Sequence, residues 1–311
     1  MSNQSAQTTS HLLMVRPASF GFNEETAANN AFQSNDGSLG KAEISQQAVA
    51  EFDAFVEKLR SHGVDVVVAE DSAFPTKPDA VFPNNWITFH EDGTVYTYPM
   101  FAPARRVERQ EGIVKQIGQK FRINRKVQLE EFESIDQYLE GTGSMIFDRQ
   151  HHLVYACLSP RTSPELLQRF CKQIRYEPVA FHALDAHGQE IYHTNVMMAL
   201  GETFVVICLE TIRDEEEREL LLDKFEETQK DVIEISLEQM SAFAGNMLQV
   251  RNASDGTLLV MSQQAYQSLT PEQVAKIQSH TEILFSPIPT IEKYGGGSAR
   301  CMMAEIFLPQ K

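Results

Sequence analysis

The sequence lacks the excess of basic residues that binding to nucleic acid or to an anionic membrane requires. Its 27 Lys and Arg residues are outnumbered by 43 Asp and Glu residues, which gives a formal net charge of −16 at pH 7. Nucleic acids and anionic membranes carry dense negative charge and select basic surfaces. We therefore expect neither as a partner, and we attribute the acidity to solubility.

Long apolar runs are also absent. No run approaches the 18 apolar residues that a transmembrane helix needs. The N-terminus has no basic segment followed by a long apolar stretch, so no signal peptide is predicted. Because residues 1–10 are mostly polar, we expect a disordered tail there, followed by a single domain over residues 11–311 of a cytoplasmic protein.

Cysteine is scarce, and its spacing excludes two common kinds of site. The four cysteines, Cys157, Cys171, Cys208 and Cys301, form no CxxC pair, so neither an ordinary zinc motif nor a disulfide framework is predicted. The first three lie in apolar strand-like or helical segments. Only Cys301 has polar, glycine-rich surroundings, in "GGGSARC". We expect no metal and no other cofactor.

Helical segments recur along the chain at intervals of roughly 50–60 residues, which is the mark of a repeat architecture. Start signals such as Ser163-Pro164 and Thr270-Pro271 support several of them. The five segments are 46–62, 104–118, 163–175, 214–229 and 271–279.

Each helical segment leads into a short strand and then a hairpin. Four hairpins are complete: "WITFHEDGTVYTYP", "SMIFDRQHHLVYACL", "TNVMMALGETFVVICL" and "NMLQVRNASDGTLLVMS". The fifth, "ARCMMAEIFL", lacks a downstream partner, and the N-terminal strand "HLLMVRP" is available to pair with it and close a ring. The pattern predicts an α/β fold, a five-bladed propeller of ββαβ repeats around a central site.

Polar residues precede the first strand of successive repeats, so the same end of each blade carries them. Cysteine, histidine and glutamate together can form a nucleophilic system in which a carboxylate orients the imidazole that moves protons for a thiolate. Taken singly, each residue has an ordinary structural explanation as a turn or surface group. The residues at these points are Asp79, Asn84, Asn85, Glu140, His193, Asn195, Asn246 and Cys301.

Four motifs in this order, "PDAVFPNNW", "LEGTGSM", "YHTNV" and "GGGSARCM", resemble the guanidine-modifying superfamily, also called the amidinotransferase or pentein superfamily. It includes dimethylarginine dimethylaminohydrolases, arginine deiminases and amidinotransferases, all on a five-bladed propeller. The resemblance covers residues 11–310. The opening "RPASFGFNEETAANNAFQ" is similar to that of citrulline-utilisation hydrolases.

The resemblance implies roles for individual residues. Cys301 matches the family nucleophile, His193 the general acid and base, and Glu140 the carboxylate that partners the histidine. Asp79 matches an acidic active-site position of the methylarginine hydrolases.

Two arginines match positions that hold the substrate α-carboxylate, Arg105 in "APARR" and Arg161 in "LSPRT". A guanidinium forks well onto a carboxylate, which supports a free amino acid as the small-molecule substrate. Residues 20–32 are predicted either as a lid with Asn23 reaching inward or as an ordinary surface loop.

Departures from the family pattern bear on the substrate. Asn85, with Asn84 beside it, replaces a carboxylate found in cation-binding relatives, and Asn195 replaces an aspartate of arginine deiminases. An amide both donates and accepts hydrogen bonds, which suits a neutral ureido group better than a guanidinium. We therefore favour citrulline, hydrolysed to ornithine, ammonia and carbon dioxide through a covalent intermediate on Cys301.

Several alternatives stay open at this point. Within the enzyme class they are an arginine deiminase or dimethylarginine hydrolase and then an amidinotransferase. Outside it they are a ribosome-binding propeller without activity and an amino-acid-binding module without catalysis. The sequence also leaves open whether the chain forms a homo-oligomer and which C–N bond breaks first.

Overall fold

The structure is a computed structural model that describes residues 5–27, 30 and 32–311. Within these residues the strands form five three-stranded sheets. The first sheet contains β15 (Ala304–Glu305), β1 (His11–Arg16) and β2 (Asp65–Glu70), and the second contains β3 (Ile87–Phe89), β4 (Thr94–Thr97) and β5 (Arg125–Gln128). The third contains β6 (Ile146–Asp148), β7 (Leu153–Cys157) and β8 (Glu177–Phe181), the fourth β9 (Met198–Leu200), β10 (Phe204–Ile207) and β11 (Asp231–Glu234), and the fifth β12 (Leu248–Arg251), β13 (Thr257–Ser262) and β14 (Glu282–Ser286).

All five sheets have the same internal order. The middle strand is antiparallel to the first strand and parallel to the third. A parallel pair needs a crossover connection, and here helices supply it. They are α2 (Lys41–Ser61), α3 (Glu111–Lys120), α5 (Pro164–Ile174), α7 (Glu215–Glu227) and the consecutive α9 (Gln263–Ser268) and α10 (Pro271–Gln278). The predicted five-bladed ββαβ fold is confirmed.

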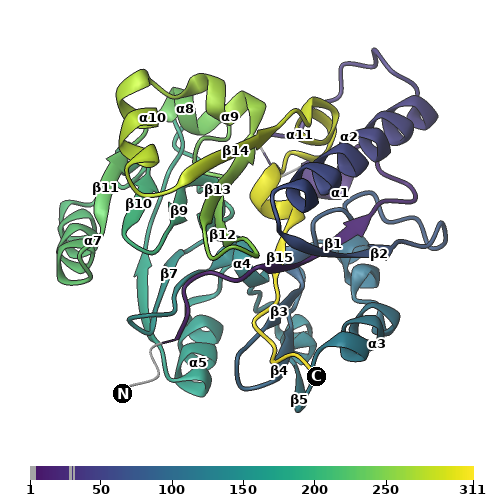
Figure 1. Cartoon of the computed structure of the whole chain (residues 1–311), viewed down its shortest axis with the longest axis horizontal. Helices are drawn as coiled ribbons and strands as arrows, with labels where there is room; N and C mark the ends of the chain where they lie inside the picture. Colours follow the sequence, from purple (N-terminus) through teal and green to yellow (C-terminus); the bar gives the residue numbers. More distant parts are fainter. Residues whose placement is uncertain (1–4, 28–29, 31) are drawn as a thin grey trace.

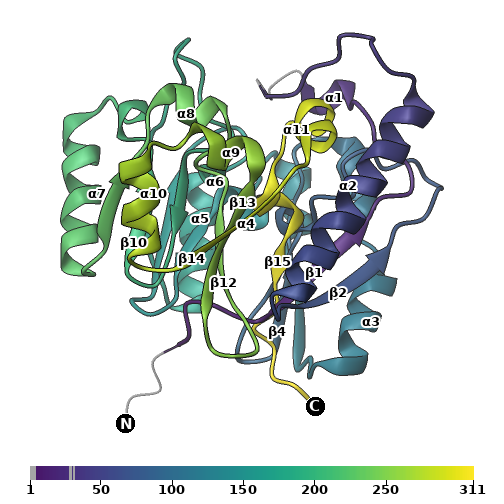
Figure 2. The same cartoon turned by 45° about the horizontal axis from the view of Figure 1, so that its top comes forward.

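The crossover helices lie on the outside of the molecule, as Figure 2 shows for α7 at one edge and for α2 and α3 at the other. Their apolar stripes pack on the sheets. On α2 this stripe includes Phe52 and Phe55, which are fully buried in the same cluster as Leu12 of β1. The predicted segment 104–118 differs, because it is divided into a 3₁₀ turn, η2 (Pro103–Glu108), and α3.

Short helical turns stand directly before the first strand of four blades. They are η1 (Pro83–Asn85), α4 (Gly141–Ser144), α6 (Thr194–Met197) and η5 (Ala299–Met302). The remaining short helices are α1 (Glu24–Ala27), η3 (Glu130–Ile135), η4 (Leu209–Thr211), α8 (Leu237–Ser241) and α11 (Pro289–Gly295).

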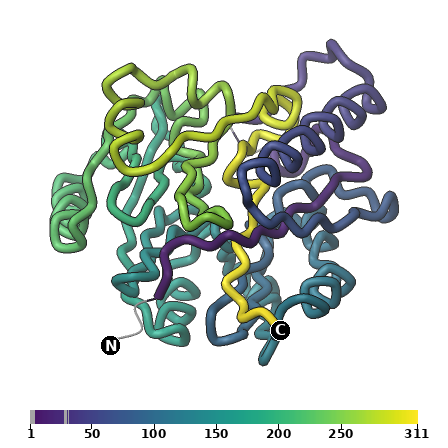
Figure 3. The backbone as a smooth tube through the Cα atoms, viewed as in Figure 1, coloured from purple at the N-terminus to yellow at the C-terminus, as the bar shows by residue number. Residues whose placement is uncertain are grey.

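The first blade joins the two ends of the chain. Leu12 pairs with Glu305 and Leu13 with Ala304, so β1 lies between β15 and β2. Figures 1 and 3 show the N-terminal strand, in purple, crossing beside the C-terminal segment, in yellow. The predicted completion of the last hairpin by the N-terminal strand is therefore confirmed.

Part of the predicted tail is packed against the body of the protein. Gln7 and Thr8 are buried, and the Gln7 side chain donates to the Phe147 carbonyl (2.8 Å) and accepts from the Arg149 backbone N–H (2.7 Å). This differs from the expected disorder over residues 1–10, of which 1–4 lie outside the described residues. In the part of the chain that the structure describes, no helix combines the length and the apolar character that crossing a bilayer demands.

Because β1 is the central strand of the closing sheet, a cavity beneath it should destabilise the whole ring. We expect Leu12→Ala to lower the free energy of unfolding by about 2–5 kcal/mol. Leu220→Ala, at a side chain of α7 that is 43% exposed, is the control and should change it by less than about 0.5 kcal/mol. Urea denaturation measures both variants. Equal free energies of unfolding for the two variants would mean that packing at β1 contributes no more to stability than an exposed side chain of α7.

Candidate active site

The turns before the first strands bring the predicted residues to the centre of the ring. The turn η1 contacts both α4 and η5, and α4 contacts α6, so segments far apart in sequence are neighbours. Six predicted residues line one cavity: Asp79, Asn85, Arg105, Arg161, His193 and Cys301. The cavity has a volume of about 20 Å³, which is room for a single water molecule. No three His, Cys, Asp or Glu side chains among the described residues are grouped as metal ligands would be.

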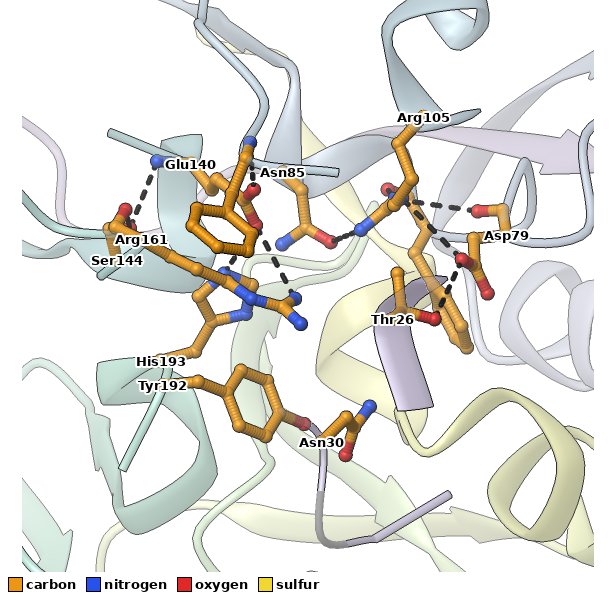
Figure 4. Close-up of polar contacts among 12 residues, drawn as sticks. Thr26, Asn30, Asp79, Asn85, Arg105, Glu140, Ser144, Arg161, Tyr192 and His193 are labelled. Atoms are coloured by element: carbon orange, nitrogen blue, oxygen red, sulfur yellow. Dashed lines mark hydrogen bonds and ion pairs between the residues drawn. The ribbon is translucent and has the colours of Figure 1, made fainter. Parts of the chain in front are cut away.

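His193 and Glu140 form a buried hydrogen-bonded pair. His193 Nε2 lies 2.7 Å from Glu140 Oε2, and the other carboxylate oxygen accepts from the Phe101 backbone N–H at 2.8 Å. Arg161 Nη1 lies 3.6 Å from Glu140 Oε2, and the guanidinium stacks over the Tyr192 ring with 4.7 Å to the ring centre. Figure 4 shows the Arg161 guanidinium between this pair and Tyr192.

Burial and the neighbouring arginines set the protonation of the pair. Burial alone would raise the pKa of the Glu140 carboxyl, but Arg161 and the hydrogen bond from His193 outweigh it and lower the pKa to about 2. Burial is also the largest effect on the pKa of His193. Together with the charges of Arg161 and Arg105 it lowers this pKa to about 4, although the hydrogen bond and the charge of Glu140 raise it. At pH 7 the pair is therefore a carboxylate and a neutral imidazole whose Nε2–H donates, which leaves the lone pair on Nδ1.

The Cys301 sulfur receives two amide N–H groups. Asn195 Nδ2 lies 3.3 Å from Sγ and Asn246 Nδ2 lies 3.2 Å from it. Asn246 is itself fixed, because its amide also donates to the Asn195 carbonyl (2.9 Å) and accepts from the Arg300 backbone N–H (2.9 Å). Hydrogen bonds to a charged acceptor are stronger than those to a neutral one, so these two donors would stabilise negative charge that develops on the sulfur during nucleophilic attack.

Asp79 lies on the opposite wall of the cavity. Its Oδ2 accepts from Asn23 Nδ2 (2.7 Å) and lies 3.8 Å from Arg105 Nε. Burial raises the pKa of Asp79, with Arg105 and Asn23 acting against it. Asn23 is buried, and its side chain contacts Asp79 behind the cavity wall, because Asn23 itself does not line the cavity.

Arg105 is engaged by groups of the protein. Its guanidinium forks onto Glu108 with Nε–Oε1 3.0 Å and Nη2–Oε2 2.8 Å, and Nη1 donates to Asn85 Oδ1 at 2.7 Å. A guanidinium can only donate, so this contact fixes which end of the Asn85 amide is oxygen. Asn85 Nδ2 makes no hydrogen bond to any described residue.

One predicted residue lies outside the cavity wall, and a nearby glycine brings two other residues of the site together. The buried Asn84 side chain is not part of the cavity wall, and its backbone carbonyl accepts from Thr142 Oγ1 at 3.3 Å. Gly143 occupies a position where no larger residue fits, because a Cβ would stand 2.4 Å from Asn85 Nδ2 and 2.8 Å from His193 Nδ1. The "GTG" turn therefore lets the amide and the imidazole approach each other.

Several residues of the site have no role assigned from the sequence. Asn246 is named there among the polar clusters, because "FAGNML" stands at the same point of its blade as the others, but without a role. Tyr192 and Asn30 had no such signal, and they meet at Gly296, whose carbonyl accepts from Tyr192 Oη (3.0 Å) and Asn30 Nδ2 (3.3 Å). Of the predicted lid, Thr26 and Asn30 line the cavity, and residues 28, 29 and 31 lie outside the described residues.

Comparison with known proteins identifies related chains. A family model described as "N,N dimethylarginine dimethylhydrolase, eukaryotic" matches residues 16–308. No curated protein matches in a sequence comparison.

Solved structures share the fold at low identity. ArgZ, an arginine dihydrolase from the ornithine-ammonia cycle in cyanobacteria, is 16% identical with a TM-score of 0.71, over 96% of this chain and 41% of ArgZ. Unliganded AgrE is 18% identical with a TM-score of 0.73, over 97% of this chain and 40% of AgrE. A dimethylarginine dimethylaminohydrolase variant in an adduct with S-methyl-L-thiocitrulline is 16% identical with a TM-score of 0.64, over 96% and 99%. The chain thus spans about two fifths of ArgZ and AgrE.

The two amide contacts predict that Asn246 increases the rate at which Cys301 reacts with an alkylating agent. Asn246→Ala removes one N–H donor from the sulfur, and we expect alkylation of Cys301 by iodoacetamide at pH 7.5 to slow by roughly tenfold. Peptide mass spectrometry assigns the modified cysteine, and Cys301→Ser identifies the background from the three other cysteines. All four are buried, and Cys301 lines the cavity. An unchanged rate would show that Asn246 does not stabilise the thiolate.

The low pKa of His193 predicts a stability loss in mild acid. In the unfolded chain the imidazole has a pKa near 6.5 and binds a proton that the folded chain excludes down to about pH 4. Stability from this group is therefore complete above pH 6.5 and declines as the pH falls toward 4, by about 2 kcal/mol at pH 5. Urea unfolding at pH 7 and pH 5 should give a smaller difference for His193→Gln than for the unaltered chain. The same difference in both would contradict a neutral buried imidazole.

Proposed function

The chain belongs to the family described as N,N dimethylarginine dimethylhydrolase, eukaryotic, within the pentein superfamily, and we propose that it hydrolyses a C–N bond at the ureido or guanidino carbon of a free arginine-like amino acid. The observation that carries this proposal is the Cys301 sulfur, which accepts two amide N–H groups in the cavity that also contains the Glu140-bound imidazole of His193. Covalent catalysis requires a nucleophile and a base that is held in position to activate it, and here these are the Cys301 sulfur and the His193 imidazole.

The proposed reaction begins when the Cys301 thiol gives its proton to His193 and the sulfur attacks the central carbon of the substrate group. His193 is neutral and has its lone pair on Nδ1, so this atom takes the thiol proton and passes it to the departing nitrogen as the C–N bond breaks. Glu140 keeps the imidazole in this tautomer and stabilises the imidazolium that forms in between. Water, deprotonated by His193, then breaks the bond between sulfur and the acyl carbon.

We propose L-citrulline as the substrate because of the polar atoms left without a partner. Among the described residues, Asn85 Nδ2 is a buried donor without a hydrogen bond, and Asn195 Oδ1 and Asp79 Oδ1 are acceptors without one. A ureido group carries one carbonyl and three N–H bonds, so it can satisfy a donor and both acceptors. A guanidinium only donates and would leave the Asn85 N–H facing another donor.

Complete hydrolysis of citrulline consumes one water and yields ornithine, ammonia and carbon dioxide. The atoms balance whichever C–N bond breaks first. If ornithine leaves first, a carbamoyl group stays on sulfur, and water releases it as carbamate, which decomposes to ammonia and carbon dioxide. Neither route needs a metal or another cofactor for its balance.

Hydrolysis of arginine or N,N-dimethylarginine is the second candidate. Family membership favours it, and so does the Asp79 carboxylate on the cavity wall, which suits a cationic group. Against it, Asp79 already contacts Arg105 and Asn23, and Glu140 contacts His193 and Arg161. The Glu140 carboxylate could therefore not bind a guanidinium without giving up a partner, and Asp79 could offer only its Oδ1.

We assign the substrate α-carboxylate to Arg161. Arg105 was predicted to share this role, but its fork is occupied by Glu108 and Asn85. We propose instead that Arg105 is a positioning residue, which orients the Asn85 amide and neutralises the charge of the Asp79 carboxylate.

A side-by-side assay of citrulline, arginine and N,N-dimethylarginine tests the function, with ornithine, citrulline and ammonia measured as products. We expect ornithine from citrulline and little product from the other two. Cys301→Ser should lower turnover by at least about 10³-fold while the circular dichroism spectrum is unchanged. Citrulline formed from arginine or dimethylarginine would instead establish the second candidate, and turnover retained by Cys301→Ser would refute covalent catalysis.

A further inference from the structure

A second, larger cavity adjoins the catalytic one and has three residues in common with it. The shared residues are Asn30, Arg161 and Tyr192. This outer chamber has a volume of about 460 Å³. Its other lining residues are Ala27, Phe32, Pro160, Asp185, Gly188, Gln189, Glu190 and Ile191.

The volumes of the two cavities indicate that different parts of an amino-acid substrate would occupy them. The catalytic cavity is far smaller than the outer chamber, about 20 Å³ against about 460 Å³, so the room for the α-carbon with its ammonium and carboxylate lies in the outer chamber. Tyr192 Oη and Asn30 Nδ2 both donate to the Gly296 carbonyl and form the partition between the cavities. Figure 4 shows the Tyr192 hydroxyl beside Asn30, with the Arg161 guanidinium above them. A side chain that passes this partition toward Cys301 leaves its head group in the outer chamber.

The charges of the outer chamber match a zwitterion. Arg161 supplies a buried cation whose orientation is fixed by Tyr192 and Glu140. Two carboxylates, Asp185 and Glu190, lie on the segment that leads into the catalytic histidine.

The two carboxylates have different surroundings. Asp185 Oδ1 accepts from the backbone N–H groups of His187 (2.8 Å) and Gln189 (2.9 Å), so this side chain holds its own turn. The Glu190 carboxylate makes no hydrogen bond or ion pair with a residue that the structure describes. Its backbone position is fixed, because Glu190 bridges Leu184 and the next residue, Ile191, donates to the Ala183 carbonyl at 2.9 Å.

We propose that the outer chamber is the head-group site, in which Glu190 binds the α-ammonium of the substrate while Arg161 binds its α-carboxylate. This inference rests on the proposed function for the identity of the substrate. Glu190 then determines specificity: it selects amino acids with an unblocked α-amine and rejects the same side chain within a peptide or on an N-acylated amino acid. Binding through both groups also sets the direction in which the side chain enters, with the ureido end toward Cys301.

Isothermal titration with two amino acids that share this head group tests the proposal. L-Ornithine is titrated into the unaltered chain, and L-citrulline into Cys301→Ser, which cannot turn it over. We expect Glu190→Gln to weaken both by about tenfold or more, because an amide loses the charge-assisted contact. Nα-acetyl-L-citrulline should bind weakly with and without the substitution. Glu57→Gln, at an exposed position of α2, is the matched control and should bind like its parent.

The outcomes separate this proposal from the function on which it rests. Unchanged affinity in Glu190→Gln, equal binding of the acetylated amino acid, or no binding of either amino acid overturns the head-group site. If the unaltered chain hydrolyses none of the three substrates but ornithine still binds in a Glu190-dependent way, the proposed reaction fails and the head-group site stands. In steady-state assays the site predicts a higher KM for citrulline in Glu190→Gln with kcat within about twofold, since Glu190 does not touch the reacting atoms.

Discussion

The antiparallel pairing of β1 with β15 joins the chain ends, and the position of the reactive sulfur depends on it. Cys301 lies in the turn η5, three residues before Ala304, which pairs with Leu13 of the N-terminal strand. The neighbouring turn η1 packs against η5, and α4 and α6 continue the contact around the ring. Cys301 thus lines the same cavity as His193, which is hydrogen-bonded to Glu140, and the three residues come from three different blades.

Desolvation determines the chemistry of the centre. Charges buried in a protein are costly unless they are paired, and here Glu140 meets Arg161 while Arg105 meets Glu108. The consequence for His193 is a neutral imidazole at pH 7, which can accept a proton from the thiol. The amides Asn195 and Asn246 then stabilise negative charge on sulfur without adding a positive charge to a site that already contains two arginines.

The ring and its principal residues could be predicted from the sequence because they repeat. Hairpins with Asp-Gly turns, helix starts at Ser-Pro and Thr-Pro, and a polar cluster before each first strand all follow local rules. The tertiary partners of those residues could not be predicted. The fork of Arg105 onto Glu108 depends on a 3₁₀ turn that the expected continuous helix over 104–118 did not contain. The closeness of Asn85 to His193 depends on Gly143, whose role is visible only where the backbones meet.

Rapid-quench mass spectrometry of the chain mixed with citrulline can detect covalent catalysis by Cys301. We expect a transient mass increase, equal to the carbonyl fragment retained from the substrate, on the peptide that contains Cys301. The increase should appear before product accumulates and should be absent from Cys301→Ser. Turnover of citrulline with no adduct at any quench time, or with an adduct on a different residue, would contradict it.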